Sequence, residues 1–141
     1  MKAIRFIHPA VIAAALALEA SPWGAVCNFA VAPESGGGTI RQTYSYFSLL
    51  PFGYANSGPL LTALLTCLLA VCAVIGIFRP DSKRIRLWLS GLSVVALLTS
   101  LMPLMFGISF YSLVGLAITL LLATSLGLSL VRALKPVQDK S

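Results

Sequence analysis

Leu60–Phe78, with the sequence LLTALLTCLLAVCAVIGIF, decides the fold class of this chain because it contains no charged side chain over 19 residues. At about 1.5 Å of rise per residue, such a helix spans most of a hydrocarbon core about 30 Å thick. The rest of the chain has the same character, with 58% hydrophobic and 10% charged residues, whereas soluble domains average about 25% charged residues. The sequence therefore predicts an all-α integral membrane protein.

Two further apolar runs follow on the carboxyl-terminal side. Leu87–Ile108 and Phe110–Val131 contain 22 residues each, and neither run carries a charge. A single helix over both runs would be about twice as long as the bilayer is thick. Pro103 and Gly107 interrupt the helical pattern between them. We therefore expect a helical hairpin.

The first apolar region allows two interpretations. In one, Lys2 and Arg5 form the basic segment of a signal peptide and residues 6–18 form its apolar core, followed by a cleavage site. In the other, a retained helix crosses the membrane, because the chain stays apolar well beyond Trp23. We favour the retained helix, which makes residues 1–141 a single membrane domain. The four expected helices cover about 9–31, 60–78, 87–107 and 110–131.

The basic residues predict how these helices are threaded. Nine of the ten lie on one side of the membrane and only Arg41 falls on the other; the nine are Lys2, Arg5, Arg79, Lys83, Arg84, Arg86, Arg132, Lys135 and Lys140. Short cytoplasmic loops collect Lys and Arg. We therefore expect a four-helix bundle in the plasma (inner) membrane, with both termini and loop 79–86 in the cytoplasm and an aromatic-rich loop over about 33–58 outside. The net charge of +6 then reflects threading and attraction to anionic lipids, and no nucleic-acid partner is expected.

No enzyme motif accompanies these helices. The sequence contains no G-x-S-x-G elbow, H-E-x-x-H pair, P-loop or paired intramembrane aspartates. It contains no C-x-x-C pair, and its one histidine does not make a metal cluster. We expect no enzymatic activity, no cofactor and no metal. The leading hypothesis is a non-enzymatic protein that acts through contacts with another membrane component, and the alternative is a small proton- or cation-coupled transporter.

Glu19 is the candidate binding residue for the transporter hypothesis. If the first helix begins near Pro9, Glu19 lies about 15 Å along it, near the bilayer centre. An ionised carboxylate there costs about 2.5–3.5 kcal/mol, so it would face the bundle, find a partner or stay protonated. If the helix instead ends at Pro22, Glu19 lies within a turn of the outer surface and reaches water. Both positions remain open from the sequence.

Two further groups of residues are candidates for contacts. The outer loop contains five aromatic side chains that suit either the membrane interface or a partner: Tyr44, Tyr46, Phe47, Phe52 and Tyr54. The last helix carries small residues every four positions, which suit close packing inside the bundle or against a second copy: Gly115, Thr119, Ala123 and Gly127. The expected partners are therefore the lipid bilayer and either another membrane protein or a second copy of the chain.

Overall fold

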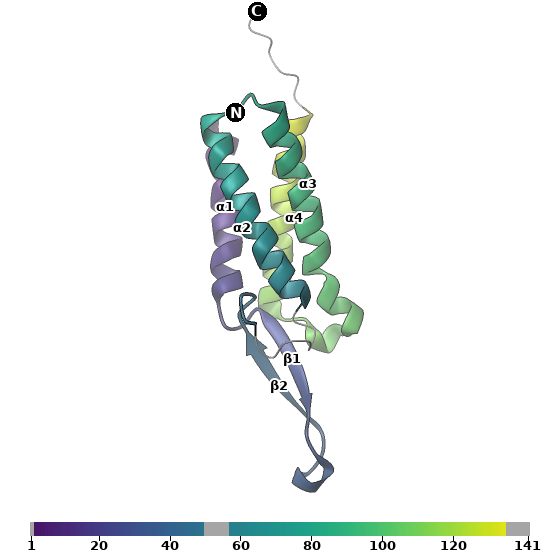
Figure 1. Cartoon of the computed structure of the whole chain (residues 1–141). Coiled ribbons are helices and arrows are strands. Elements are labelled where there is room, and N and C mark those ends of the chain that lie inside the picture. The colour runs from purple at the N-terminus through teal and green to yellow at the C-terminus, as the bar shows by residue number, and fades with distance from the viewer. Residues whose placement is uncertain (1, 50–56, 135–141) are drawn as a thin grey trace, which may run out of the picture.

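The computed structural model describes residues 2–49 and 57–134, with side chains from residue 4 onward. This part of the chain is mostly helical, and four α-helices run alongside one another (Figure 1). A two-stranded antiparallel hairpin projects beyond one end of the helices. The elements are α1 (Lys2–Ala20), β1 (Ala25–Ala30), β2 (Thr39–Tyr44), α2 (Ser57–Phe78), α3 (Lys83–Ser100) and α4 (Leu113–Ala133). The predicted helical fold class with four helices is confirmed, whereas the hairpin was not predicted.

Three of these helices are long and apolar enough to cross a membrane. They are α2, α3 continued through the 3₁₀ turn that ends at Phe106, and α4. Their outward faces carry exposed leucines, among them Leu68 and Leu120. Such helices are compatible with a membrane location, where lipid rather than protein covers an apolar face.

The first helix differs from the expected range of 9–31 at both ends. It starts at Lys2, includes Pro9 in its interior and ends at Ala20, and residues 25–30 form β1. Pro22 lacks the N–H that a continuing helix needs and restricts the residue before it. Val26 and Phe29 favour strands. An apolar run does not by itself separate a helix from a strand, and this is where the expectation was wrong.

The hairpin has a regular register and a glycine tip. Ala25 pairs with Tyr44 at its base and Ala30 pairs with Thr39 near its tip. The turn contains residues 36–38, all glycines with positive φ values of 99°, 63° and 107°, which L side chains rarely adopt. The first half of β1 is buried against the bundle, whereas β2 is exposed along its length up to Tyr44.

The interior of the bundle is built from small and hydroxyl side chains. On α4 the buried residues are Gly115, Ile118, Thr119, Leu122, Ser125 and Ser129. Of the expected stripe of small residues, Gly115 and Thr119 are buried, whereas Ala123 and Gly127 are exposed. Steps of four residues rotate about 40° around an α-helix, so a stripe spaced by four leaves the buried face within three steps. Most of the buried positions avoid this drift, because the steps between residues 115, 118, 122, 125 and 129 alternate between three and four.

The start of α2 approaches the end of α3 closely at Gly58, and a substitution there tests this packing. A side chain there would place its Cβ 2.8 Å from Met102 Cβ and 3.3 Å from the carbonyl oxygen of Thr99. We expect Gly58→Val to lower the free energy of unfolding by about 1–3 kcal/mol, as overpacking does. Gly127 has open space around it, and Gly127→Val is the control, expected to be neutral or slightly stabilising. Thermal unfolding in a mild detergent measures both, and equal midpoints would contradict this packing.

Candidate functional site: a buried carboxyl beneath the hairpin

Glu19 lies in the last turn of α1 with its side chain fully buried, at 0% exposure. The hydroxyl of Thr66 on α2 donates a hydrogen bond of 2.8 Å to Glu19 Oε1. The second oxygen, Oε2, is buried and has no hydrogen-bond partner among the residues that the structure describes. Glu19 is therefore near the end of the helix, but its carboxyl is buried among the helices and is not exposed.

The main chain just after the hairpin forms a hydrogen bond with the last turn of α1, at Glu19 itself. The backbone N–H of Tyr46 donates to the carbonyl oxygen of Glu19 at 2.8 Å. The Tyr46 ring is 2% exposed and lies so close to Gly24 that a Cβ on that glycine would be 2.9 Å from the ring. Burial, followed by the neighbouring Tyr111 and Glu19, raises the pKa of the Tyr46 hydroxyl above its usual range. Tyr46 is therefore a neutral anchor in the base of the hairpin.

The start of α4 binds the base of the hairpin as well. Ser112 caps α4, because its Oγ accepts from the backbone N–H of Gly115 at 2.8 Å. The same hydroxyl donates to the carbonyl oxygen of Gly24 at 2.6 Å. Further out, the cross-strand pair Asn28 and Arg41 donates to backbone carbonyls of residues 109 and 111. The hairpin is thus attached to α1, to α4 and to the connection between α3 and α4.

Hydroxyl groups continue from Glu19 across the neighbouring helices. One turn from Thr66, Thr62 donates to Thr99 Oγ1 on α3 at 2.9 Å. Thr119 on α4 donates to Ser100 Oγ on α3 at 3.1 Å. Such bonds between helices contribute about 0.6–2 kcal/mol each in membrane bundles. They hold the half of the bundle beneath the hairpin together and leave the carboxyl as its one acidic group in the described residues.

The five aromatic residues of the predicted outer loop do not form one surface in the described part. Tyr46 points inward, and Tyr44 is half-buried with its hydroxyl bonded to Gln42 Oε1. Phe47 is exposed, while Phe52 and Tyr54 lie outside the described residues. Sequence reasoning missed the exposed strand β2, although two runs with strand-forming residues on either side of a glycine cluster are a hairpin signal.

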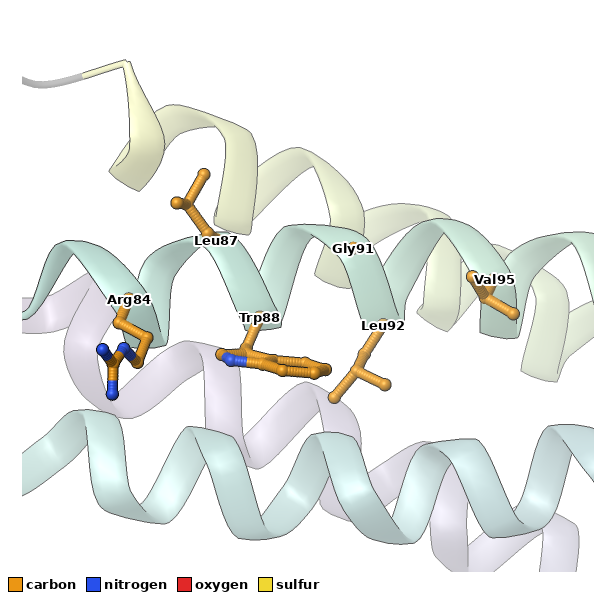
Figure 2. A pocket seen from close by; sticks show the side chains of 6 residues that line it. All are labelled: Arg84, Leu87, Trp88, Gly91, Leu92 and Val95. Atoms are coloured by element: carbon orange, nitrogen blue, oxygen red, sulfur yellow. The ribbon is translucent and has the colours of Figure 1, made fainter.

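A groove of about 380 Å³ lies on α3, away from Glu19. Figure 2 shows Arg84, Trp88 and Leu92 leaving the helix on the same side, with Gly91 between the larger side chains. The lining is almost entirely apolar, and the exposed side chains of Leu87 and Trp88 belong to it. Its position on the outward face of one helix makes it a surface feature of the bundle rather than a route to the carboxyl.

Within residues 2–49 and 57–134, no group of three or more His, Cys, Asp or Glu side chains could hold a metal ion. No family model matches the chain, and no curated protein or solved structure is similar to it.

Proposed function

We propose that this chain is a multi-pass protein of the inner membrane, with four spanning helices and its hairpin on the outer side. The ends of the helices support this threading, because Arg5, Arg79, Lys83 and Arg132 all lie at the end opposite the hairpin (Figure 1). Cytoplasmic segments carry such an excess of basic residues. Packing of α1 against α2 and α4 supports its retention as a fourth span, since 19 residues extend about 28 Å.

The two tryptophans support the same placement. Trp23 follows α1 at the hairpin end and is 62% exposed, whereas Trp88 lies near the start of α3 at the basic end and is 60% exposed. Tryptophan is enriched at both membrane–water interfaces, where its ring is apolar and its N–H stays hydrated. The pair therefore lies where the two interfaces fall in the proposed threading.

Labelling of introduced cysteines tests the threading. Ser35 in the hairpin turn and Asp81 in the turn between α2 and α3 are both exposed. On intact cells, we expect a membrane-impermeant maleimide to label Ser35→Cys but not Asp81→Cys, and to label both after lysis. Burial raises the pKa of the native Cys27 thiol, so its reaction is slow. Labelling of Asp81→Cys alone on intact cells would reverse the proposed orientation.

We further propose that the protein is non-enzymatic and presents the hairpin to another membrane protein. The observation that carries this role is the exposure of β2, including Ile40 at 53%, above a base that is attached to two helices. No further strand borders the two-stranded sheet in the described part, and an open strand edge can pair with a strand of a partner. Because the base holds the hairpin in place, binding requires little additional ordering.

A photo-crosslinking amino acid at Ile40 tests this role in native membranes. Leu120, exposed on the outward face of α4, is the matched control. We expect one adduct of defined mass from position 40 and none from position 120, and we expect Tyr46→Ala to abolish the adduct. An adduct of twice the chain mass would identify a second copy as the partner. Equal labelling from both positions, or none from position 40, would refute the role.

The unpartnered oxygen of Glu19 favours a second candidate function, a small proton- or cation-coupled transporter. A buried carboxyl with one neutral hydrogen-bond donor is suited to binding a proton or a cation. We expect Glu19→Gln to abolish proton flux in reconstituted vesicles and to prevent modification by a hydrophobic carbodiimide. Flux that is unchanged in Glu19→Gln, or absent from the native protein, would refute this candidate.

A further inference from the structure

A second polar cluster lies at the basic end of the bundle, opposite the hairpin. Arg132 near the end of α4 is central to it, because Arg86 of α3 donates to its carbonyl oxygen at 3.2 Å. His8 of α1 is fully buried, and its Nδ1 lies 3.4 Å from Arg132 Nη1. Arg5, one turn earlier on α1, donates to the carbonyl oxygen of Ile77 near the end of α2. The cluster thus brings three arginines together from three helices.

The charges of Arg5 and Arg132 are not balanced by a carboxylate in the described part. Among the described residues, their guanidinium groups bond to a backbone carbonyl and a neutral imidazole. Arg5 lies three residues before His8 on α1, and the His8 ring contacts Arg132. In addition, Arg5 Nε is buried without a hydrogen-bond partner among the described residues. Both side chains are half-buried, so a small ligand can reach them.

His8 determines how Arg132 is directed. A guanidinium group only donates hydrogen bonds, so His8 Nδ1 must be the acceptor. The proton of the neutral imidazole is then on Nε2, which lies 2.9 Å from Ser125 Oγ and donates to it. Ser125 is in turn 3.4 Å from Ser93 Oγ. His8 is therefore a positioning residue that adds no charge and fixes Nη1 of the Arg132 guanidinium group.

We propose that Arg5 and Arg132 bind a phosphate group, with His8 positioning Arg132. The planar guanidinium fork matches phosphate oxygens in pairs. Two sources share this chemistry, namely the headgroup of an anionic phospholipid and free phosphate. Basic pockets between membrane helices on the cytoplasmic side bind lipid headgroups. The lipid source rests on the proposed threading, whereas the phosphate site does not.

Ligand-dependent stability of the full-length chain in a zwitterionic detergent tests this site and is independent of orientation. The additions are phosphatidylglycerol, phosphatidylcholine and inorganic phosphate, each titrated while the thermal midpoint is measured. We expect a saturable rise with phosphatidylglycerol and none with phosphatidylcholine. A similar rise with inorganic phosphate would identify free phosphate as the ligand, and no rise with it would identify the lipid.

Variants distinguish binding at Arg132 from nonspecific attraction to the basic end of the helices. We expect Arg132→Gln to weaken the apparent affinity about tenfold or more, as loss of a charged hydrogen bond does. Arg132→Lys, which keeps the charge but loses the fork, should be intermediate. Arg84→Gln removes an exposed charge near Arg86, in the first turn of α3. This variant should bind phosphate like the native chain. Equal weakening by Arg84→Gln and Arg132→Gln, or no rise with any phosphate compound, would overturn the proposal.

Discussion

Replacement of Tyr46 by alanine is expected to lower the free energy of unfolding by about 3–5 kcal/mol, as loss of other buried aromatic rings does. The ring is 2% exposed and lies against Gly24 and Gly115, and neither glycine has a side chain that could fill the space. The cavity would therefore remain. Denaturant unfolding in a mild detergent measures the loss.

The same substitution should release the hairpin before the bundle unfolds. Arg41, the basic residue of the hairpin, donates to the carbonyl oxygen of Tyr111 when the strands are docked. We expect trypsin to cleave after Arg41 at least tenfold faster in Tyr46→Ala, because about 1.4 kcal/mol of lost docking energy gives that factor. Tyr44→Ala is the control, since Tyr44 is half-buried and its hydroxyl bonds locally to Gln42. Equal cleavage rates in both variants would contradict the anchoring role.

Glu19→Lys should have the second large effect, a loss of about 2.5–3.5 kcal/mol or more from a buried ammonium in the bundle. The carboxyl position is 0% exposed, and the described residues around it supply no carboxylate that could pair with the new charge. We expect a low yield in the membrane fraction and a lower thermal midpoint. Both quantities are measured on the detergent-solubilised full chain.

Glu19→Gln is the matched control for this substitution. Its amide oxygen can accept the hydrogen bond that Thr66 donates to Oε1 in the native chain, and it introduces no charge. We expect its stability to lie within about 1 kcal/mol of the native value. If Glu19→Lys were as stable as Glu19→Gln, the carboxyl would have to reach water, contrary to its burial.

The sequence predicts an element correctly where its local pattern fits only one type of secondary structure. The uncharged run Leu60–Phe78 lies inside α2, which starts three residues earlier at Ser57, because a long apolar run has few other ways to satisfy its backbone. The sequence predicts a helix over residues 25–30, where the structure has a strand, because apolar composition fits a helix and a strand equally well. There the decisive information was the pairing with residues 39–44, which is a contact between segments rather than a local property.

The surroundings of Glu19 are only partly predictable from the sequence, because they also depend on contacts between segments. Glu19 could be selected from the sequence as a single acid in an apolar region, but its depth depended on where α1 ends. Its partner Thr66 comes from another helix and has no distinctive sequence context. From the sequence, Arg5 and Arg132 contribute only to the predicted threading, because the contact between Arg132 and His8, one turn after Arg5, exists only in the folded chain.

The attachment of the hairpin has a mechanical consequence. Tyr46 closes the last turn of α1 through the carbonyl oxygen of Glu19, and Ser112 joins the first turn of α4 to Gly24 below the strands. A force applied to the strands therefore reaches α1 and α4 through short hydrogen bonds and a buried ring, without passing through a slack linker. Movement of the hairpin is therefore coupled to the ends of α1 and α4.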